Sequence, residues 1–250
     1  MMAVGFFDGV HLAHKRVLES AGQIASRSGL ALSAMTFYPH PRQVIGAAGK
    51  PFDYITPPAE KMRRMQECGV DHLYWVDFDG SFASLTAEEY VRRYVLDNQV
   101  RHVVAGFDFK YGRRGEGDVK RLRDMGEGRF GVTVVPAMNK RGEKVSSTRI
   151  REWISVGELG LVPEYLGRSH ETEGAVRAAA PGLLTVGWDE PYLLPPPGRY
   201  EVDLHGGGAC LISAAAELTS GRELAVRAEV PDFRRWLGLT ARAVWKRRLS

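Results

Sequence analysis

Two histidines, His11 and His14, stand three residues apart just after a turn that contains glycine. Residues 1–7 form an apolar run long enough for one buried strand, and from residue 10 to about residue 28 apolar residues recur at helical spacing. A strand that turns through glycine into a helix points the free N–H groups and the positive end of that helix at the crevice above the sheet. The stretch therefore predicts an anion site, with both imidazoles on one face of the first helical turn.

A lone histidine pair at this spacing has two other interpretations. It can be a hydrogen-bonded surface pair on an ordinary strand-to-helix turn, which is the commoner case when nothing else accompanies it. A metal site fits less well than either, because no third ligand is spaced nearby.

The stretch Gly5-Phe-Phe-Asp-Gly-Val-His-Leu-Ala-His14 resembles the GxFDGxHxGH signature of the nucleotidyltransferases, in particular that of bacterial FAD synthetases. Ala13 stands where the signature has a glycine, which adds a methyl group where backbone approaches phosphate. Only four residues precede Gly5, fewer than in members of that family. We therefore expect either a minimal first strand or a chain start further upstream.

Two later loops resemble motifs on the flavin side of the same family. A second predicted strand, residues 30–37, ends in Tyr38-Pro-His-Pro-Arg42, which resembles the family's TFxPHPR loop and is held extended by its prolines. Residues 106–118 resemble its G-x-DF-x-x-G-x-x-x-x-GD loop. Taken alone, the first would be a rigid connector. The second, rich in glycine and with three cations nearby, has two equally good interpretations, a loop that folds over phosphates or a solvated surface loop.

Two helix starts also resemble the family. Thr56-Pro-Pro-Ala-Glu-Lys61 resembles its "TP–EK" helix, which we interpret as structural. Val145-Ser-Ser-Thr-Arg-Ile-Arg151 resembles its ISSTxxR motif, with valine for isoleucine. Hydroxyls at a helix N-terminus, followed one turn later by arginine, can bind a polyphosphate, although Ser-Ser-Thr by itself is only a helix cap.

The resemblance implies adenylyl transfer, in which the 5′-phosphate of FMN attacks the α-phosphorus of ATP to give FAD and pyrophosphate. It implies a catalytic set that binds the phosphates, namely His11, His14, Ser147 and Arg151. It implies further ATP contacts from Gly5, Phe6, Phe7, Asp8, Gly9, Ser146, Thr148 and Arg149. It implies FMN contacts from Pro39, His40, Pro41, Arg42, Asp108 and Phe109. Mg²⁺ is expected to be held mainly by phosphate oxygens, so we expect no metal ligands from the protein.

Five alternations of strand and helix predict a doubly wound α/β domain with a parallel sheet over residues 1–168. Residues 169–250 alternate short β-like runs with Gly- and Pro-rich turns, which predicts a small, mostly β domain. Residues 232–249 show helical spacing, so a C-terminal helix is expected there. In the family this position holds a riboflavin kinase barrel. Its GFPTAN stretch, whose Thr and Asn serve ATP and its metal, has no counterpart here, so we expect a degenerate barrel without kinase activity.

Charge and composition narrow the function classes. The net charge of +4 lies entirely in residues 1–168, which hold 24 Lys and Arg against 20 Asp and Glu. This mild excess suits polyphosphate substrates, whereas nucleic-acid binding would call for a denser basic face. No apolar run approaches membrane-spanning length. The two cysteines, Cys68 and Cys210, fall in different predicted domains, which favours a reduced, cytoplasmic protein.

Two alternatives to an FMN adenylyltransferase stay open. One is a nucleotidyltransferase of the same fold with another phosphate acceptor. The two loops that resemble the flavin-specific branch argue against this alternative. The other is a flavin or nucleotide binder without catalysis, for which Ala13 and the degenerate second half would be signs of decay.

Overall fold

Five parallel strands form the sheet of the first unit, in the order β3-β2-β1-β4-β7. The central strand, β1, is the first one in the chain, and the strand order runs outward from it in both directions. In doubly wound folds, a ligand crevice lies at the carboxyl end of the strand where the order reverses. The strands are β1 Met2–Val4, β2 Ser33–Tyr38, β3 His72–Asp77, β4 His102–Gly106 and β7 Gly131–Val135.

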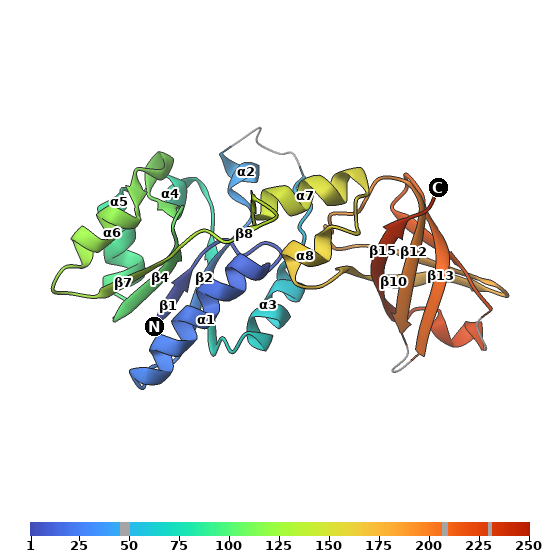
Figure 1. The fold of residues 1–250 in the computed structure, drawn as a ribbon, viewed down its shortest axis with the longest axis horizontal. Helices are drawn as coiled ribbons and strands as arrows, with labels where there is room; N and C mark the ends of the chain where they lie inside the picture. Colours follow the sequence, from blue (N-terminus) through green and yellow to red (C-terminus); the bar gives the residue numbers. More distant parts are fainter. Residues whose placement is uncertain (46–50, 207–209, 230–231) are drawn as a thin grey trace. The chain divides into compact units, whose positions relative to one another are not determined.

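Both faces of this sheet are covered. Along β1, Ala3 packs in one apolar cluster with α1, while Met2 and Val4 pack in a second cluster with Tyr90 of α5. The helices that flank the sheet are α1 Leu12–Arg27, α2 Pro41–Val44, α3 Pro58–Glu67, α4 Gly80–Ala83, α5 Ala87–Val91 and α6 Val119–Gly126. The predicted doubly wound parallel-sheet domain is thereby confirmed (Figure 1).

The computed structural model describes residues 1–45, 51–206, 210–229 and 232–250. Backbone contacts group residues 1–52 with 58–144 as one unit, and residues 53–57 with 145–250 as another. The division into functional domains at residue 168 stays a prediction. Within the described ranges, no helix combines the length and the apolar character that crossing a bilayer requires.

The second unit is built on a closed antiparallel barrel with the strand order β10-β11-β14-β13-β12-β15. Two helices precede it, α7 Ser147–Val156 and α8 Val162–Leu166. Alternate side chains, among them Tyr200 and Trp245, fill the interior. The strands are β10 His170–Ala180, β11 Leu183–Gly187, β12 Gly198–Gly206, β13 Cys210–Leu218, β14 Glu223–Arg227 and β15 Thr240–Arg248.

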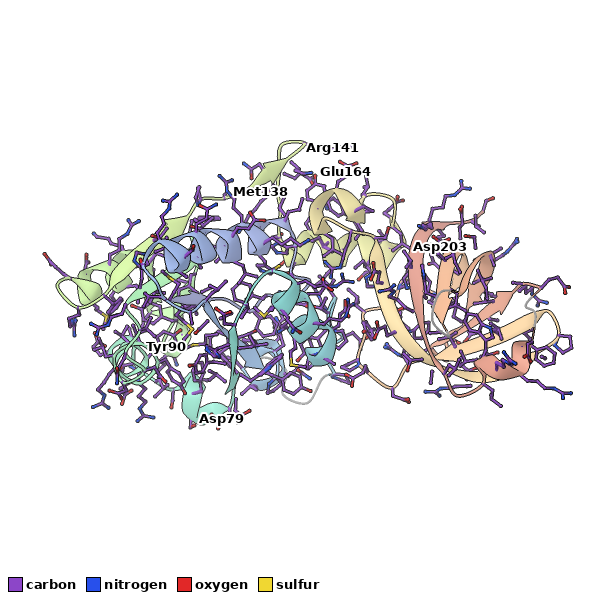
Figure 2. All side chains as sticks on the ribbon, turned by 90° about the horizontal axis from the view of Figure 1, so that it is seen from below. Asp79, Tyr90, Met138, Arg141, Glu164 and Asp203 are labelled. Carbon is purple, nitrogen blue, oxygen red and sulfur yellow. The ribbon has the colours of Figure 1, made fainter. Side chains whose placement is uncertain are left out.

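The barrel's outer face is polar where its interior is apolar. Asp203, labelled in Figure 2, comes from β12 and pairs with Lys246 of β15 at 2.7 Å and with the hydroxyl of Ser213 at 2.6 Å. Tyr90, labelled in the same view, is by contrast buried in the first unit. The predicted small, mostly β domain is confirmed, and its six strands form a closed barrel.

The predicted C-terminal helix over residues 232–249 is wrong. A single 3₁₀ turn, Phe233–Trp236, leads into β15, which pairs with both β10 and β12 and so closes the barrel. Ala241, Ala243 and Trp245 alternate into the buried face. The helical spacing of the apolar residues was a weaker signal than this pairing with strands far away in the sequence.

A short segment just before α3 is paired with the chain that precedes β12. The Tyr54 N–H donates to the carbonyl of Pro191 at 2.6 Å, and the Leu193 N–H donates to the carbonyl of Tyr54 at 2.7 Å. Tyr54, Ile55 and Thr56 are all buried. Residues 53–57 therefore belong structurally with the barrel unit, although neighbours on both sides in the sequence belong to the first unit.

Candidate active site

The two histidines of the first motif are fixed to each other at the start of α1. His11 is the N-cap of the helix, and its Nδ1 accepts a hydrogen bond from the His14 N–H at 3.2 Å. The two rings stack with their centroids 3.5 Å apart and their planes 15° apart. Phe7 meets the His14 ring edge-on at 5.2 Å. The predicted pair thus stands where α1 offers its unpaired N–H groups and the positive end of its dipole.

The turn between β1 and α1 holds two residues in the left-handed region. Phe7 has φ 56° and Val10 has φ 42°, and both side chains are buried. A β-branched residue rarely adopts this backbone conformation, so the surrounding packing must hold it there. Gly5 makes room for the turn, because a Cβ at that position would lie 3.0 Å from the Phe7 ring. Such held strain is typical of ligand-binding turns.

His14 is a neutral imidazole with an unsatisfied nitrogen. Burial lowers the pKa of His14 well below its ordinary value of 6.5, and the charges of His11 and Lys61 lower it further. Its Nδ1 is shielded from solvent and has no hydrogen-bond partner among the residues that the structure describes. A buried polar atom without a partner is costly, which marks this nitrogen as one that a ligand could satisfy.

The predicted flavin loop lies against the first motif. His40, at the end of β2, meets the ring of Phe6 at 4.2 Å and stacks on Phe52 at 3.9 Å. His40 also caps α2, with its Nδ1 accepting from the Arg42 N–H at 3.1 Å and its own N–H donating to the Gln43 side chain at 3.2 Å. The carboxyl ends of β1 and β2 thus bring together residues predicted for ATP and for FMN.

The loop over residues 106–118 is a hairpin tied to the start of α5. It contains β5 Lys110–Tyr111, a 3₁₀ turn Arg113–Gly115 and β6 Gly117–Asp118. The Arg113 N–H donates to the Leu85 carbonyl at 2.6 Å, and the Glu116 carboxylate accepts from the Ala87 N–H at 2.8 Å.

The two residues predicted to contact FMN in this loop make different contacts in the structure. Asp108 forms an ion pair with Lys144 at 2.5 Å. Phe109 packs partly buried beside Tyr111, at 5.7 Å between ring centroids. The structure therefore separates the two neighbours, one at the surface and one against the apolar cluster that covers the sheet.

The hydroxyl-rich motif begins α7 in the second unit. Ser146 is the N-cap, and its Oγ accepts from the Arg149 N–H at 3.3 Å, while Ser147 and Thr148 occupy the first two helical positions. Arg149 pairs with Glu152 at 3.0 Å, and its guanidinium lies 4.9 Å from the centre of the Trp153 ring. Arg151 donates from Nη1 to the carbonyl of Asp53 at 2.7 Å.

Lys61, a lysine with 1% of its surface exposed, lies beside the first motif and is not among the residues predicted for the site. Its Nζ donates to the Phe6 carbonyl at 2.9 Å and lies 3.3 Å from the Thr36 hydroxyl, which donates to the same carbonyl at 2.8 Å. Burial lowers the pKa of Lys61 to about 8, and the carboxylate of Asp8 acts in the opposite direction. The sequence signal for Lys61 is its place in the TP–EK stretch, which resembles a family motif.

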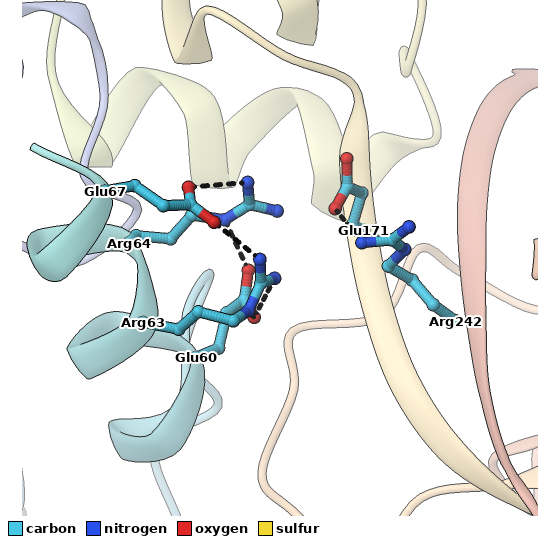
Figure 3. A network of polar contacts seen from close by, with 6 residues as sticks. All are labelled: Glu60, Arg63, Arg64, Glu67, Glu171 and Arg242. Carbon is cyan, nitrogen blue, oxygen red and sulfur yellow. Dashed lines mark hydrogen bonds and ion pairs between the residues drawn. The ribbon is translucent and has the colours of Figure 1, made fainter. Parts of the chain in front are cut away.

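The charged residues next to Lys61 on α3 form an ion-pair network with one another. The buried carboxylate of Glu60 binds Arg63 and Arg64 at 2.5 and 2.6 Å, and Glu67 completes the network at 2.8 Å from Arg63 (Figure 3). Figure 3 also shows Glu171 with Arg242 of the barrel, 4.0 Å apart. Lys61, one position after Glu60, is not part of this network and turns to the carbonyl of Phe6 instead.

No group of three or more His, Cys, Asp or Glu side chains suited to a metal ion occurs within the described residues.

A family model described as FAD synthetase matches residues 1–149, which is more than half of the chain. The chain belongs to the FAD synthetase family. The predicted family is thus confirmed. The bifunctional riboflavin kinase/FMN adenylyltransferase of Bacillus subtilis (strain 168) is 39% identical over 215 residues, which cover 83% of this chain and 68% of that protein. The FAD synthetase of Listeria monocytogenes (strain ATCC BAA-679 / EGD-e) is 34% identical over 204 residues, which cover 81% of this chain and 80% of that protein.

The fold also matches a solved structure over its whole length. The crystal structure of a macrolide-efflux protein from Streptococcus pneumoniae has a TM-score of 0.87 and 26% identity to this member of the FAD synthetase family. The match covers 100% of this chain and 84% of that chain. The order along the chain, a parallel-sheet unit followed by a barrel, is therefore shared with that protein.

Proposed function

We propose that this member of the FAD synthetase family transfers the AMP group of ATP to the phosphate of FMN and releases pyrophosphate. Family membership supports the reaction. The observation that carries the proposal to particular residues is the stacked pair of His11 and His14 at the N-terminus of α1, in a strained turn at the carboxyl end of β1. An anion-binding helix start at this place in a doubly wound sheet suits a nucleotide phosphate.

The reaction needs alignment and charge neutralisation more than acid–base chemistry. An oxygen of the FMN phosphate forms a bond to the α-phosphorus of ATP, while the bond from that phosphorus to the oxygen that bridges to the β-phosphorus breaks. Pyrophosphate leaves with the electron pair of the broken bond. The phosphate nucleophile is already an anion near neutral pH, so no covalent intermediate and no strong base are required. Donors fixed in advance supply the acceleration.

Each proposed residue has a part in that alignment. His11 and the N–H groups of α1 bind phosphate oxygens, and the neutral ring of His14 offers its unsatisfied nitrogen to the transferred group. The remaining ATP contacts are proposed for Gly5, Phe6, Phe7, Asp8 and Gly9 in the first motif, and for Ser146, Ser147, Thr148, Arg149 and Arg151 on the β- and γ-phosphates. FMN contacts are proposed for Pro39, His40, Pro41, Arg42, Asp108 and Phe109.

Mg²⁺ is proposed to enter with ATP, bound by phosphate oxygens, and to neutralise charge on the departing pyrophosphate. The partners in this account are the small molecules ATP and FMN, and neither nucleic acid nor membrane takes part. We place the reaction in the cytoplasm, where ATP is available. Riboflavin kinase activity is proposed to be absent, because the barrel segment between Gly174 and Tyr200 has no counterpart of the GFPTAN stretch, whose Thr and Asn serve ATP and its metal.

The variant His14→Ala tests the site, with His72→Ala as the matched control on the exposed edge strand β3. Pyrophosphate release from Mg-ATP and FMN is expected to fall about 10²- to 10³-fold in His14→Ala, the usual effect of removing one such donor, and to be unchanged in His72→Ala. Near-full activity of His14→Ala would overturn the assignment. Pyrophosphate formed with a different phosphate acceptor but not with FMN would favour another nucleotidyltransferase, and FMN binding without pyrophosphate would favour a binder.

A further inference from the structure

Lys61 places a full positive charge inside the first unit, directly against the proposed phosphate-binding turn. Its ammonium touches the carbonyl of Phe6, the last residue before the left-handed Phe7, and the hydroxyl of Thr36 on β2. It also lies 4.4 Å from the centre of the Phe6 ring and 5.2 Å from that of Trp75. One lysine thus holds the ends of two neighbouring strands and faces the aromatic side chain of the turn.

Stability alone does not account for a charge at this place. Burying an ammonium costs several kcal/mol, and replacing a buried ion pair as a whole by apolar side chains of similar volume is often neutral or stabilising. The printed contacts of the ammonium are with neutral groups, a carbonyl, a hydroxyl and two aromatic rings. Two titratable groups also act on it: the carboxylate of Asp8, which is itself buried, and the imidazole of His14, whose pKa burial lowers. A methionine could fill the same space between the rings of Phe6 and Trp75. The charge therefore points to a role other than packing.

We propose that Lys61 is a positioning residue of adenylyl transfer, which fixes the Phe6 carbonyl at the start of the turn and adds a buried positive charge to the anion site of α1. The inference rests on the proposed function. A charge that is already buried needs no reorganisation when ATP arrives, and it acts in surroundings of low dielectric constant, where it attracts phosphate strongly. The hydrogen bond to Phe6 keeps the turn in the strained conformation that aims the helix start at the ligand.

The first test compares Lys61→Met with wild type, and Lys120→Met, an exposed lysine on α6, is the matched control. Lys61→Met is expected to lower the melting temperature, because the buried Asp8 carboxylate loses the positive charge that faces it. In the folded variant, kcat/KM for ATP at pH 7 is expected to fall about 10- to 100-fold. Lys120→Met is expected to change neither quantity. Wild-type kinetics in folded Lys61→Met would overturn the inference while leaving the proposed function intact, whereas the proposed function fails if wild type itself makes no FAD.

The pH dependence of kcat/KM distinguishes the effect of the Lys61 charge from that of its hydrogen bond, because a neutral lysine can still donate to the Phe6 carbonyl. Since the pKa of Lys61 lies near 8, kcat/KM of wild type is expected to fall above about pH 8, so the gap between wild type and Lys61→Met narrows from pH 7 to pH 9. A constant gap would overturn the role of the charge. If Lys61→Met does not fold, Lys61→Arg tests the role of the charge, because arginine stays protonated up to pH 9. The inference predicts that kcat/KM of Lys61→Arg does not fall above about pH 8. A fall like that of wild type would contradict the inference.

Discussion

The guanidinium of Arg151 donates a hydrogen bond to the main-chain carbonyl of Asp53, across 98 residues of sequence and a distance of 2.7 Å. The carboxylate of Asp53 in turn pairs at 3.0 Å with Arg222, which also donates to the Tyr192 carbonyl at 2.7 Å. Arg222 lies in the turn between β13 and β14 of the barrel. The arginine proposed for the polyphosphate is therefore held by residue 53, whose own side chain is bound by the β13–β14 turn of the barrel.

Arg151→Lys is expected to raise KM for ATP by tenfold or more, because lysine keeps the charge but loses the planar fork that can serve the Asp53 carbonyl and a phosphate together. Arg222→Ala is expected to raise KM for ATP only about two- to fivefold, since a partly exposed ion pair contributes at most about 1 kcal/mol. Steady-state pyrophosphate release measures both. Equal KM values in all three proteins would contradict the proposed role of Arg151.

The stability of the barrel should depend on pH through His170. Burial lowers the pKa of this histidine to about 4, further lowered by Arg168 and opposed by the hydrogen bond with the Leu193 carbonyl. Between the unfolded value near 6.5 and pH 4 the unfolded chain binds the extra proton, so the free energy of unfolding falls as pH drops through this window. The expected loss is about 3 kcal/mol in total.

Urea titrations at intervals from pH 7 to pH 4 measure this contribution. His170→Gln retains an N–H near the position of Nε2 but does not titrate, so its free energy of unfolding should fall less over the same range than that of wild type. Carboxylates whose pKa is lowered, such as Asp203, titrate in both proteins and cancel in the comparison. Identical pH dependence in the two proteins would exclude His170 as the source.

The close approach of β10 and β11 at Gly174 gives a third prediction. A Cβ at this position would lie 2.6 Å from the Gly187 carbonyl oxygen and 2.9 Å from Cγ1 of Val186, and the carbonyl belongs to paired backbone that cannot easily move. Gly174→Ala should therefore destabilise the barrel by about 1–3 kcal/mol. Gly80→Ala, in α4 with no atom within 4 Å of the added carbon, is the control and should leave stability unchanged. Thermal melts that coincide for both variants would contradict the packing described here.

Features that depend on neighbouring residues could be predicted from the sequence. The apolar runs at residues 1–7 and 30–37 predicted two strands, which the structure contains as β1 and β2, neighbours in the parallel sheet. The turn that carries His11 and His14 was likewise predicted from a local pattern, because strand, glycine and helix follow each other directly.

Features that depend on distant partners could not be predicted. Residues 240–248 were predicted to be helical, but their conformation is decided by pairing with β10 and β12. Lys61 follows Glu60 in a charged helix and its sequence neighbours suggest a solvated position, whereas its burial depends on Phe6 and Thr36. The contact of Arg151 with Asp53 likewise joins segments that no local pattern connects.

A chromatographic assay with Mg-ATP, offered FMN in one tube and riboflavin in another, tests the central claim most directly. We predict FAD and an equal amount of pyrophosphate from FMN, with riboflavin left unchanged. FMN or FAD formed from riboflavin would show that the barrel retains kinase activity and would refute that part of the account. FMN left unconverted by the wild-type protein, with no pyrophosphate released, would contradict the assignment of adenylyl transfer itself.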